Sequence, residues 1–462
     1  MAILIWALLS LVGGGPSVFF TLVALALLGR LDPHLIVSIA SVAALFCNWG
    51  PTFINPKWLA TIGGGVSSRV FVSKVYNMKM STLEIWAEVV ALALVVGIPF
   101  FFSRFRGFFF ARSGLWGLLT MNTLIILIAS NSPGIFYWSI FWWMVFVIIN
   151  RALIWQMSYQ FLHRDEIYKR PFYWWIPLLD VGRFTGKSHA YLERFRARDE
   201  RDLAIVRLKA LKLAIWLFLI HLLARLMAPL LGLPGWRLPF LPDALFTKTV
   251  IGHFHQFLKG NFPSLLEVWW SLIVTFFFDL ICWTIINNAC VIVIRFFGFK
   301  IPRGVYRPLE ARSIPEYFAR RYYYYKELIF DLFVLPMFFH LGAIRSRQWR
   351  LFWAVTIGLG VGSFLTHLLV ETPSLRGQDP WLVVMRFTPI IGRGLVFGII
   401  FGLYQFGNPL KVPENRFWSW QRVVNLMGII FFFSVAKIFT PIMSTWDPLQ
   451  NVKFFFYIFG FR

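Results

Sequence analysis

Residues 265–296 read LLEVWWSLIVTFFFDLICWTIINNACVIVIRF, an almost unbroken apolar run. A helix that spans a membrane needs about 20 consecutive apolar residues, because the hydrocarbon layer is about 30 Å thick. This run is long enough to cross that layer. Lipid offers no hydrogen bonds to a polypeptide backbone, so a segment crossing it must be helical. The run therefore predicts a membrane-spanning helix.

Comparable apolar stretches occur along the whole chain of 462 residues. They are residues 3–29, 34–48, 84–103, 113–130, 134–150, 203–232, 325–341, 349–370, 387–406 and 422–440. Only 14% of residues are charged, whereas soluble domains carry about 25%, so there is too little polar material to cover a soluble surface. The sequence predicts an all-α, polytopic transmembrane protein with about ten to twelve spans or re-entrant helices. We expect one integral membrane domain over residues 1–462.

The formal net charge is +24, which raises the question of nucleic-acid binding. The basic residues lie in short segments between apolar stretches, at 104–112, 183–212, 300–312 and 345–350, as the positive-inside rule describes. We therefore expect a lipid bilayer and no nucleic acid as the partner, with these segments on the cytoplasmic side. The densest segment, 183–212, is expected to form a loop and an amphipathic helix on anionic lipid. The alternative is that it binds a phosphate-bearing donor such as coenzyme A.

Several familiar motifs fail on inspection. Residues 182–188 resemble a P-loop, but they have one residue too few between the glycines and no strand before them. His253 and His255 would lie on one side of an extended segment, but no third ligand is evident, so no metal site is predicted. The cysteines are Cys47, Cys282 and Cys290. Because they lack metal or disulfide spacing, they are expected to be buried free thiols.

Polar residues inside apolar stretches carry the functional signal, because they are costly in lipid and usually face a cavity or a partner. His367 lies deep in the 349–370 stretch. Small residues at positions 358, 360, 362 and 363 predict that another helix, or a ligand, approaches closely there. Asp279, in the 265–296 stretch, is expected to pair with an arginine or a lysine. Locally, His367 is read either as a helix-packing hydrogen bonder or as a catalytic group.

Residues 306–336 read YRPLEARSIPEYFARRYYYYKELIFDLFVLP. This segment resembles the signature of the membrane-bound O-acyltransferase (MBOAT) family in its bacterial polysaccharide O-acetylase branch. The matching residues are Ala311, Ser313, Ile314, Glu316, Tyr317, Phe318 and Arg320. The family's catalytic histidine follows on the next apolar helix, and His367 falls in that order and at that distance. The resemblance covers about residues 135–440 and is specific over 306–371. It divides the chain into N-terminal helices (1–135), an MBOAT-like core (135–440) and a C-terminal aromatic segment (441–462).

The chain also departs from the family pattern. Thr366 and Leu368 stand where the family has tryptophan and glycine beside the histidine, and Tyr322 replaces a family histidine. Two interpretations stay open. The chain is a divergent acyltransferase with a different acceptor, or it is a protein that kept the fold and lost the chemistry.

The resemblance implies a transfer of an acyl group, expected to be acetyl, from acyl-coenzyme A to a hydroxyl of an envelope or exported polysaccharide. It implies that His367 is the general base, with Tyr322 as a second catalytic residue. Arg320 and Arg321 are expected to bind or orient the donor. Ser313 and Glu316 complete the expected site, where Glu316 holds the arginines. No metal and no tightly bound cofactor is implied.

The implied location is the bacterial cytoplasmic (inner) membrane, with a periplasmic or extracellular protein partner. The main alternative is a catalytically inactive, MBOAT-like scaffold subunit of a larger envelope complex. A secondary transporter is disfavoured, because the sequence shows neither two similar halves nor paired broken helices in matching positions.

Overall fold

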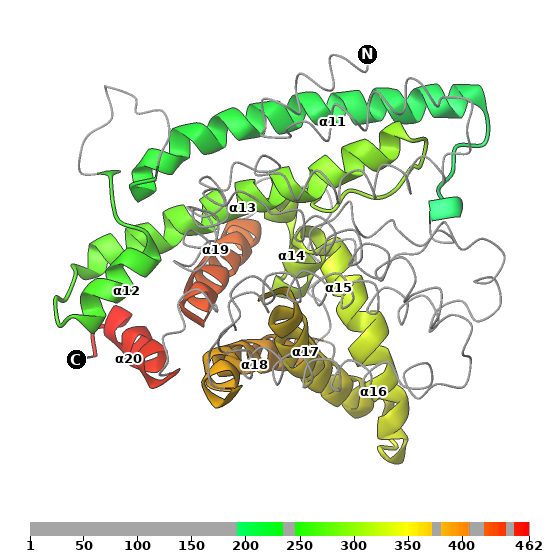
Figure 1. Cartoon of the computed structure of the whole chain (residues 1–462). Coiled ribbons are helices and arrows are strands. Elements are labelled where there is room, and N and C mark those ends of the chain that lie inside the picture. The colour runs from blue at the N-terminus through cyan, green and yellow to red at the C-terminus, as the bar shows by residue number, and fades with distance from the viewer. Residues whose placement is uncertain are drawn as a thin grey trace, which may run out of the picture.

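The computed structural model describes residues 192–233, 245–371, 380–404, 406, 420–439 and 448–461. Within these ranges the chain is all-α, with ten α-helices, short 3₁₀ and π segments, and no sheet (Figure 1). The helices are α11 (Glu200–Met227), α12 (Val250–Leu258), α13 (Leu265–Phe296), α14 (Ile314–Arg321), α15 (Tyr323–Ile329), α16 (Leu335–His340), α17 (Arg347–Glu371), α18 (Pro380–Tyr404), α19 (Trp420–Val435) and α20 (Pro448–Ile458). The predicted spans before residue 192, the N-terminal division 1–135, the 182–188 motif and Cys47 lie outside the described residues.

The predicted apolar stretches in the described part form helices. Helix α13 coincides with residues 265–296, and α17, α18 and α19 contain most of the three later stretches. Two described helices, Leu265–Phe296 and Arg422–Phe439, are long and apolar enough to cross a membrane by length and composition. The stretch 325–341 falls in successive pieces, because a π segment (Phe330–Val334) separates α15 from α16.

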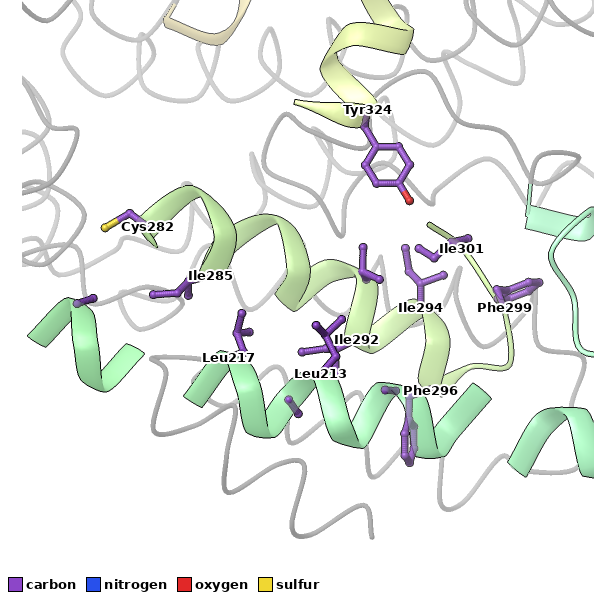
Figure 2. Close-up of a cluster of buried hydrophobic side chains, with 14 of the residues drawn as sticks. Leu213, Leu217, Cys282, Ile285, Ile292, Ile294, Phe296, Phe299, Ile301 and Tyr324 are labelled. Carbon is purple, nitrogen blue, oxygen red and sulfur yellow. The ribbon is translucent and has the colours of Figure 1, made fainter. Parts of the chain in front are cut away.

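Helices α11 and α13 pack side by side along much of their length (Figure 1). Leu213 and Leu217 of α11 point toward Ile285 and Ile292 of α13, and all four side chains are buried (Figure 2). Cys282 is buried at the edge of this cluster and is not part of a disulfide, as the sequence predicts for it. Close packing of these buried side chains holds the two helices together. This interface is therefore the scaffold on which α13 presents its other face.

The ends of this helix pair are joined where two basic segments meet. Ala197 donates its backbone N–H to the carbonyl of Gly298 (2.8 Å), and Lys300 donates its own to the carbonyl of Phe195 (2.6 Å). The Lys300 side chain forms an ion pair with Asp202 in the first turn of α11. The structure thus brings the basic segments 183–212 and 300–312 together through their described residues.

Helix α17 approaches α18 at backbone distance. A Cβ atom added to Gly394 would lie 2.6 Å from the carbonyl oxygen of Leu359, and one added to Gly398 would overlap the backbone of Thr356. On α17 itself, a Cβ atom on Gly360 would lie 2.7 Å from a methyl group of Leu395. Only glycine fits at positions 394 and 398, because a side chain there would overlap the backbone of α17, whereas Gly360 meets a leucine side chain.

A second face of α17 is equally close to the π segment. A Cβ atom added to Gly358 would lie 2.7 Å from Cγ2 of Val334, and one added to Gly362 would lie 2.8 Å from the ring of Phe333. The prediction that small residues at 358–363 admit a neighbouring helix is therefore confirmed on two sides. Helix α17, which carries His367, is fixed between α18 and the π segment.

The predicted partner of Asp279 is also found. Asp279 of α13 forms an ion pair with Lys437, in the 3₁₀ segment Ala436–Phe439 that follows α19. Asp279 is buried. A buried charge is tolerated only when it is paired, so this contact ties α13 to the end of α19.

Replacing Gly398 by alanine is expected to destabilise the protein. The added methyl overlaps the Thr356 backbone, and overpacking of this kind costs about 1–3 kcal/mol. Gly392 is the matched control, because it lies on the same helix and a Cβ atom there meets nothing within 4 Å. Thermal unfolding of the detergent-purified protein should show a lower Tm for Gly398→Ala and an unchanged or higher Tm for Gly392→Ala. Equal Tm values for both variants would contradict the close approach.

Candidate functional site

His367 lies on α17 with its ring orientation set by its own helix. Its Nδ1 atom is 2.8 Å from the carbonyl oxygen of Ser363. A carbonyl oxygen only accepts hydrogen bonds, so Nδ1 is the protonated, donating nitrogen in this contact. The neutral ring then carries its acceptor lone pair on Nε2. This tautomer is the one that a general base acting through Nε2 requires.

Two residues that the sequence reasoning did not single out for catalysis contact or adjoin this histidine. The Tyr325 ring centroid lies 6.4 Å from that of His367, in an edge-on arrangement at 81°. The Tyr325 hydroxyl donates to Oγ of Ser363 at 3.3 Å. Ser363 therefore links the two side chains, through its carbonyl to His367 and through its hydroxyl to Tyr325. A further charge, that of Arg393 on α18, acts electrostatically on His367.

Tyr322, the predicted second catalytic residue, is one contact removed from the histidine. It lies at the junction of α14 and α15. Its ring packs against Trp283 (5.4 Å between centroids), Phe318 (5.2 Å) and Tyr325 (6.4 Å). Tyr325 thus contacts both Tyr322 and His367. The sequence signal that could have identified Tyr325 is its spacing, since it lies one helical turn beyond Tyr322 in the same run of tyrosines.

Arg320 and Glu316 form a pair one turn apart on α14. Nη2 of Arg320 lies 2.6 Å from Oε1 of Glu316, and Nη1 donates to the carbonyl oxygen of Arg307 at 3.1 Å. The expectation that Glu316 holds an arginine is confirmed for Arg320. Arg307 itself has a left-handed backbone with φ of 45°, so its carbonyl is presented to Arg320 from an unusual conformation.

Ser313 begins α14 as its N-terminal cap. Its Oγ accepts a hydrogen bond from the backbone N–H of Glu316 at 3.2 Å. The other carboxylate oxygen of Glu316 accepts from the backbone N–H of Arg312 at 2.7 Å. A serine cap followed three residues later by glutamate is a common helix start. The polar atoms of Ser313 and Glu316 thus serve local structure in the first place.

Arg321 is buried, with 1% of its surface exposed. Its Nη1 donates to the Tyr317 hydroxyl at 2.9 Å. Its guanidinium carbon lies 4.9 Å from the ring centroid of Tyr322 and 5.9 Å from that of Phe276. Unlike Arg320, it is not held by Glu316. The two neighbouring arginines therefore occupy opposite environments, one neutralised at the surface and one enclosed by aromatic rings.

The pair His253 and His255 is not arranged as the sequence reading assumed. That reading placed both rings on one side of an extended segment, but the residues lie in helix α12. Side chains two positions apart in a helix point in diverging directions. His253 is buried and its Nε2 lies 2.9 Å from the Thr247 hydroxyl, whereas His255 is exposed. The described residues contain no group of three histidine, cysteine or acidic side chains that could hold a metal ion.

No protein-family model matches the chain, and no curated protein matches it either.

His253 is expected to make the fold acid-sensitive. Burial lowers the pKa of His253 below its ordinary value, which is about 6.5 in an unfolded chain. As pH falls below that value, the unfolded chain binds the proton first, so the folded state loses stability. Melting temperatures between pH 7.5 and 5 should fall more for the wild type than for His253→Gln. His255→Gln is the control, because its ring is exposed. A wild-type pH profile identical to that of His253→Gln would refute this role.

Proposed function

We propose that this protein is a membrane-bound O-acyltransferase. It moves an acyl group, acetyl in the simplest case, from a thioester donor such as acetyl-coenzyme A to a hydroxyl of an envelope or exported polysaccharide. The observation that carries the proposal is the bond from His367 Nδ1 to the Ser363 carbonyl, which leaves Nε2 to accept a proton. The likeness of residues 306–371 to the MBOAT signature supports the same chemistry. The proposed location is the bacterial inner membrane.

The proposed reaction proceeds by direct transfer. Nε2 of His367 takes the proton of the acceptor hydroxyl while its oxygen attacks the thioester carbonyl carbon. The resulting oxyanion collapses and the carbon–sulfur bond breaks. The imidazolium of His367 then gives its proton to the departing thiolate. General base catalysis of this kind is worth about 10²- to 10⁴-fold in rate. A cation placed near the developing oxyanion adds electrostatic stabilisation, and Arg393 is the candidate because its charge acts on His367.

The remaining predicted residues have supporting roles in this proposal. Tyr325 and Ser363 position His367, because they contact each other at 3.3 Å and flank its ring. Tyr322 shapes the wall behind Tyr325. Ser313, Glu316 and Arg320 fix α14 and the loop that leads to it. They orient the donor through the placement of this helix.

A scaffold is the second candidate function. Ser313, Glu316 and Arg320 bond to one another and to the nearby backbone, an arrangement that a purely structural helix start also needs. Thr366 and Leu368 depart from the family pattern beside the histidine. In this alternative the protein anchors a periplasmic or extracellular partner in an envelope complex and catalyses nothing.

Transfer of labelled acetyl from acetyl-coenzyme A by the purified protein separates the two candidates. His367→Ala is expected to reduce transfer about 10²- to 10⁴-fold, because the general base is lost. His340→Ala is the matched control, since Nδ1 of His340 also lies near the carbonyl four residues before it, that of Pro336 at 3.1 Å, on the exposed part of α16. Equal transfer by wild type and His367→Ala would remove the histidine from the mechanism. No transfer to any of a panel of sugar acceptors would favour the scaffold.

Tyr325→Phe should lower kcat about 2- to 12-fold with little change in KM for the donor. The loss corresponds to one hydrogen bond of about 0.5–1.5 kcal/mol to Ser363. Tyr322→Phe is the control, because the described structure records ring contacts of Tyr322 but no hydrogen bond of its hydroxyl. A larger kcat loss in Tyr322→Phe than in Tyr325→Phe would reverse the assignment of the two tyrosines.

A further inference from the structure

The most deeply buried cation of the described chain is Arg321, on the last turn of α14. Aromatic rings surround its guanidinium group. The ring centroids of Tyr322, Tyr317 and Phe276 lie 4.9, 5.8 and 5.9 Å from its central carbon. Such rings attract a cation through their negative faces. They accept few of its hydrogen bonds, so the N–H groups still need partners.

Among the described residues, one edge of this guanidinium has no hydrogen-bond partner. Nη1 donates to the Tyr317 hydroxyl, but Nε and Nη2 are buried without any hydrogen-bond acceptor. Nε and Nη2 form the side of the guanidinium that presents two parallel N–H groups. This edge matches the two oxygens of a carboxylate or a phosphate in a bidentate contact.

In two other arginines of the described chain, the same Nε–Nη2 edge donates to a backbone carbonyl. In Arg295, Nε and Nη2 both donate to the carbonyl oxygen of Ile301, at 3.0 and 2.8 Å. In Arg350 the same two atoms donate to the carbonyl oxygen of Ile344, at 3.1 and 2.8 Å. Both residues are less buried than Arg321. The edge that lacks an acceptor therefore belongs to the most buried of the three arginines, where an unpaired donor is most unfavourable.

The charge of Arg321 is also uncompensated. Among the described residues no carboxylate forms an ion pair with it, whereas the neighbouring Arg320 faces Glu316 at 2.6 Å. A buried charge without a counter-ion and a buried donor without an acceptor are both strongly unfavourable. An anion on the open edge would relieve both costs at once.

We propose that the Nε–Nη2 edge of Arg321 is a binding site for an oxyanion of the carboxylate or phosphate class. The site lies within the aromatic enclosure of Tyr317, Tyr322 and Phe276. Its placement connects it to the histidine, since Tyr322 contacts Tyr325 and Tyr325 contacts His367. The proposed site does not depend on the proposed acyl transfer. It should bind its anion whether or not His367 is catalytic.

Ligand-dependent melting of the full-length protein tests the site. The protein is purified in neutral detergent and chloride buffer, and sodium phosphate, sodium acetate and coenzyme A are titrated separately. A ligand that binds only the folded state stabilises it by RT ln(1 + L/Kd), where L is the free ligand concentration, so Tm rises with the logarithm of that concentration once it exceeds Kd. Wild type, His367→Ala and Arg350→Lys are expected to respond alike to at least one probe. Arg321→Gln is expected to bind that probe about 10- to 100-fold more weakly, because a charge-assisted two-point contact is lost.

Arg321→Lys keeps the charge and removes the two-point edge, so it guards against a glutamine variant that does not fold. It is expected to bind more weakly than wild type. A response to phosphate and coenzyme A alone assigns a phosphoryl group, and a response to acetate alone assigns a carboxylate. Competition by phosphatidylglycerol in nanodiscs identifies a lipid headgroup as the source of the phosphate. Wild-type affinity in the folded Arg321 variants, or no rise in the wild-type Tm with any probe beyond that of the Arg321 variants, would overturn the proposal.

Discussion

The described structure depends on the close contact of α17 with its two neighbours. Glycines at 394 and 398 bring α18 against the backbone of α17, and glycines at 358 and 362 bring the π segment against another face. Contact at backbone distance brings many atoms of the helices within van der Waals range, and the sum of these small attractions holds the helices together. His367 is carried on the helix that these contacts fix. Its position is thus set by glycines that take no part in chemistry.

Charged groups are few in the apolar part, and most of them have an assigned partner. Asp279 meets Lys437 across two helical elements, Asp202 meets Lys300 where two basic segments join, and Glu316 meets Arg320. The first two pairs tie together segments that are far apart in the chain, whereas the third forms within helix α14. Arg321 is the exception among the described residues, since its charge is enclosed by rings and the Nε–Nη2 edge of its guanidinium is buried without an acceptor. Because Arg321 departs from this pairing of charges, it is the residue at which we propose a ligand.

The histidine site combines local and long-range contacts. The hydrogen bond from His367 to the Ser363 carbonyl forms within one helix, so it holds wherever α17 lies. The contact with Tyr325 joins two helices across the close interface, so it depends on the glycines. The proposed role of His367 therefore depends on both the local hydrogen bond and the long-range contact. We propose different roles for Tyr325 and Tyr322 because Tyr325 contacts His367 directly, whereas Tyr322 reaches it through Tyr325.

For the described residues, the sequence by itself determined the helical segments, the presence of a histidine within one of them, the close approach around residues 358–363 and the need of Asp279 for a basic partner. These features follow from length, hydropathy and side-chain size, which are local properties. Only the tertiary structure decided that Lys437 is that partner, that Tyr325 contacts His367, that residues 253–255 are helical, and that Arg321 has an open edge. Such contacts depend on how helices rotate and slide against one another. Residues far apart in the chain set that register jointly, so no single stretch of sequence encodes it.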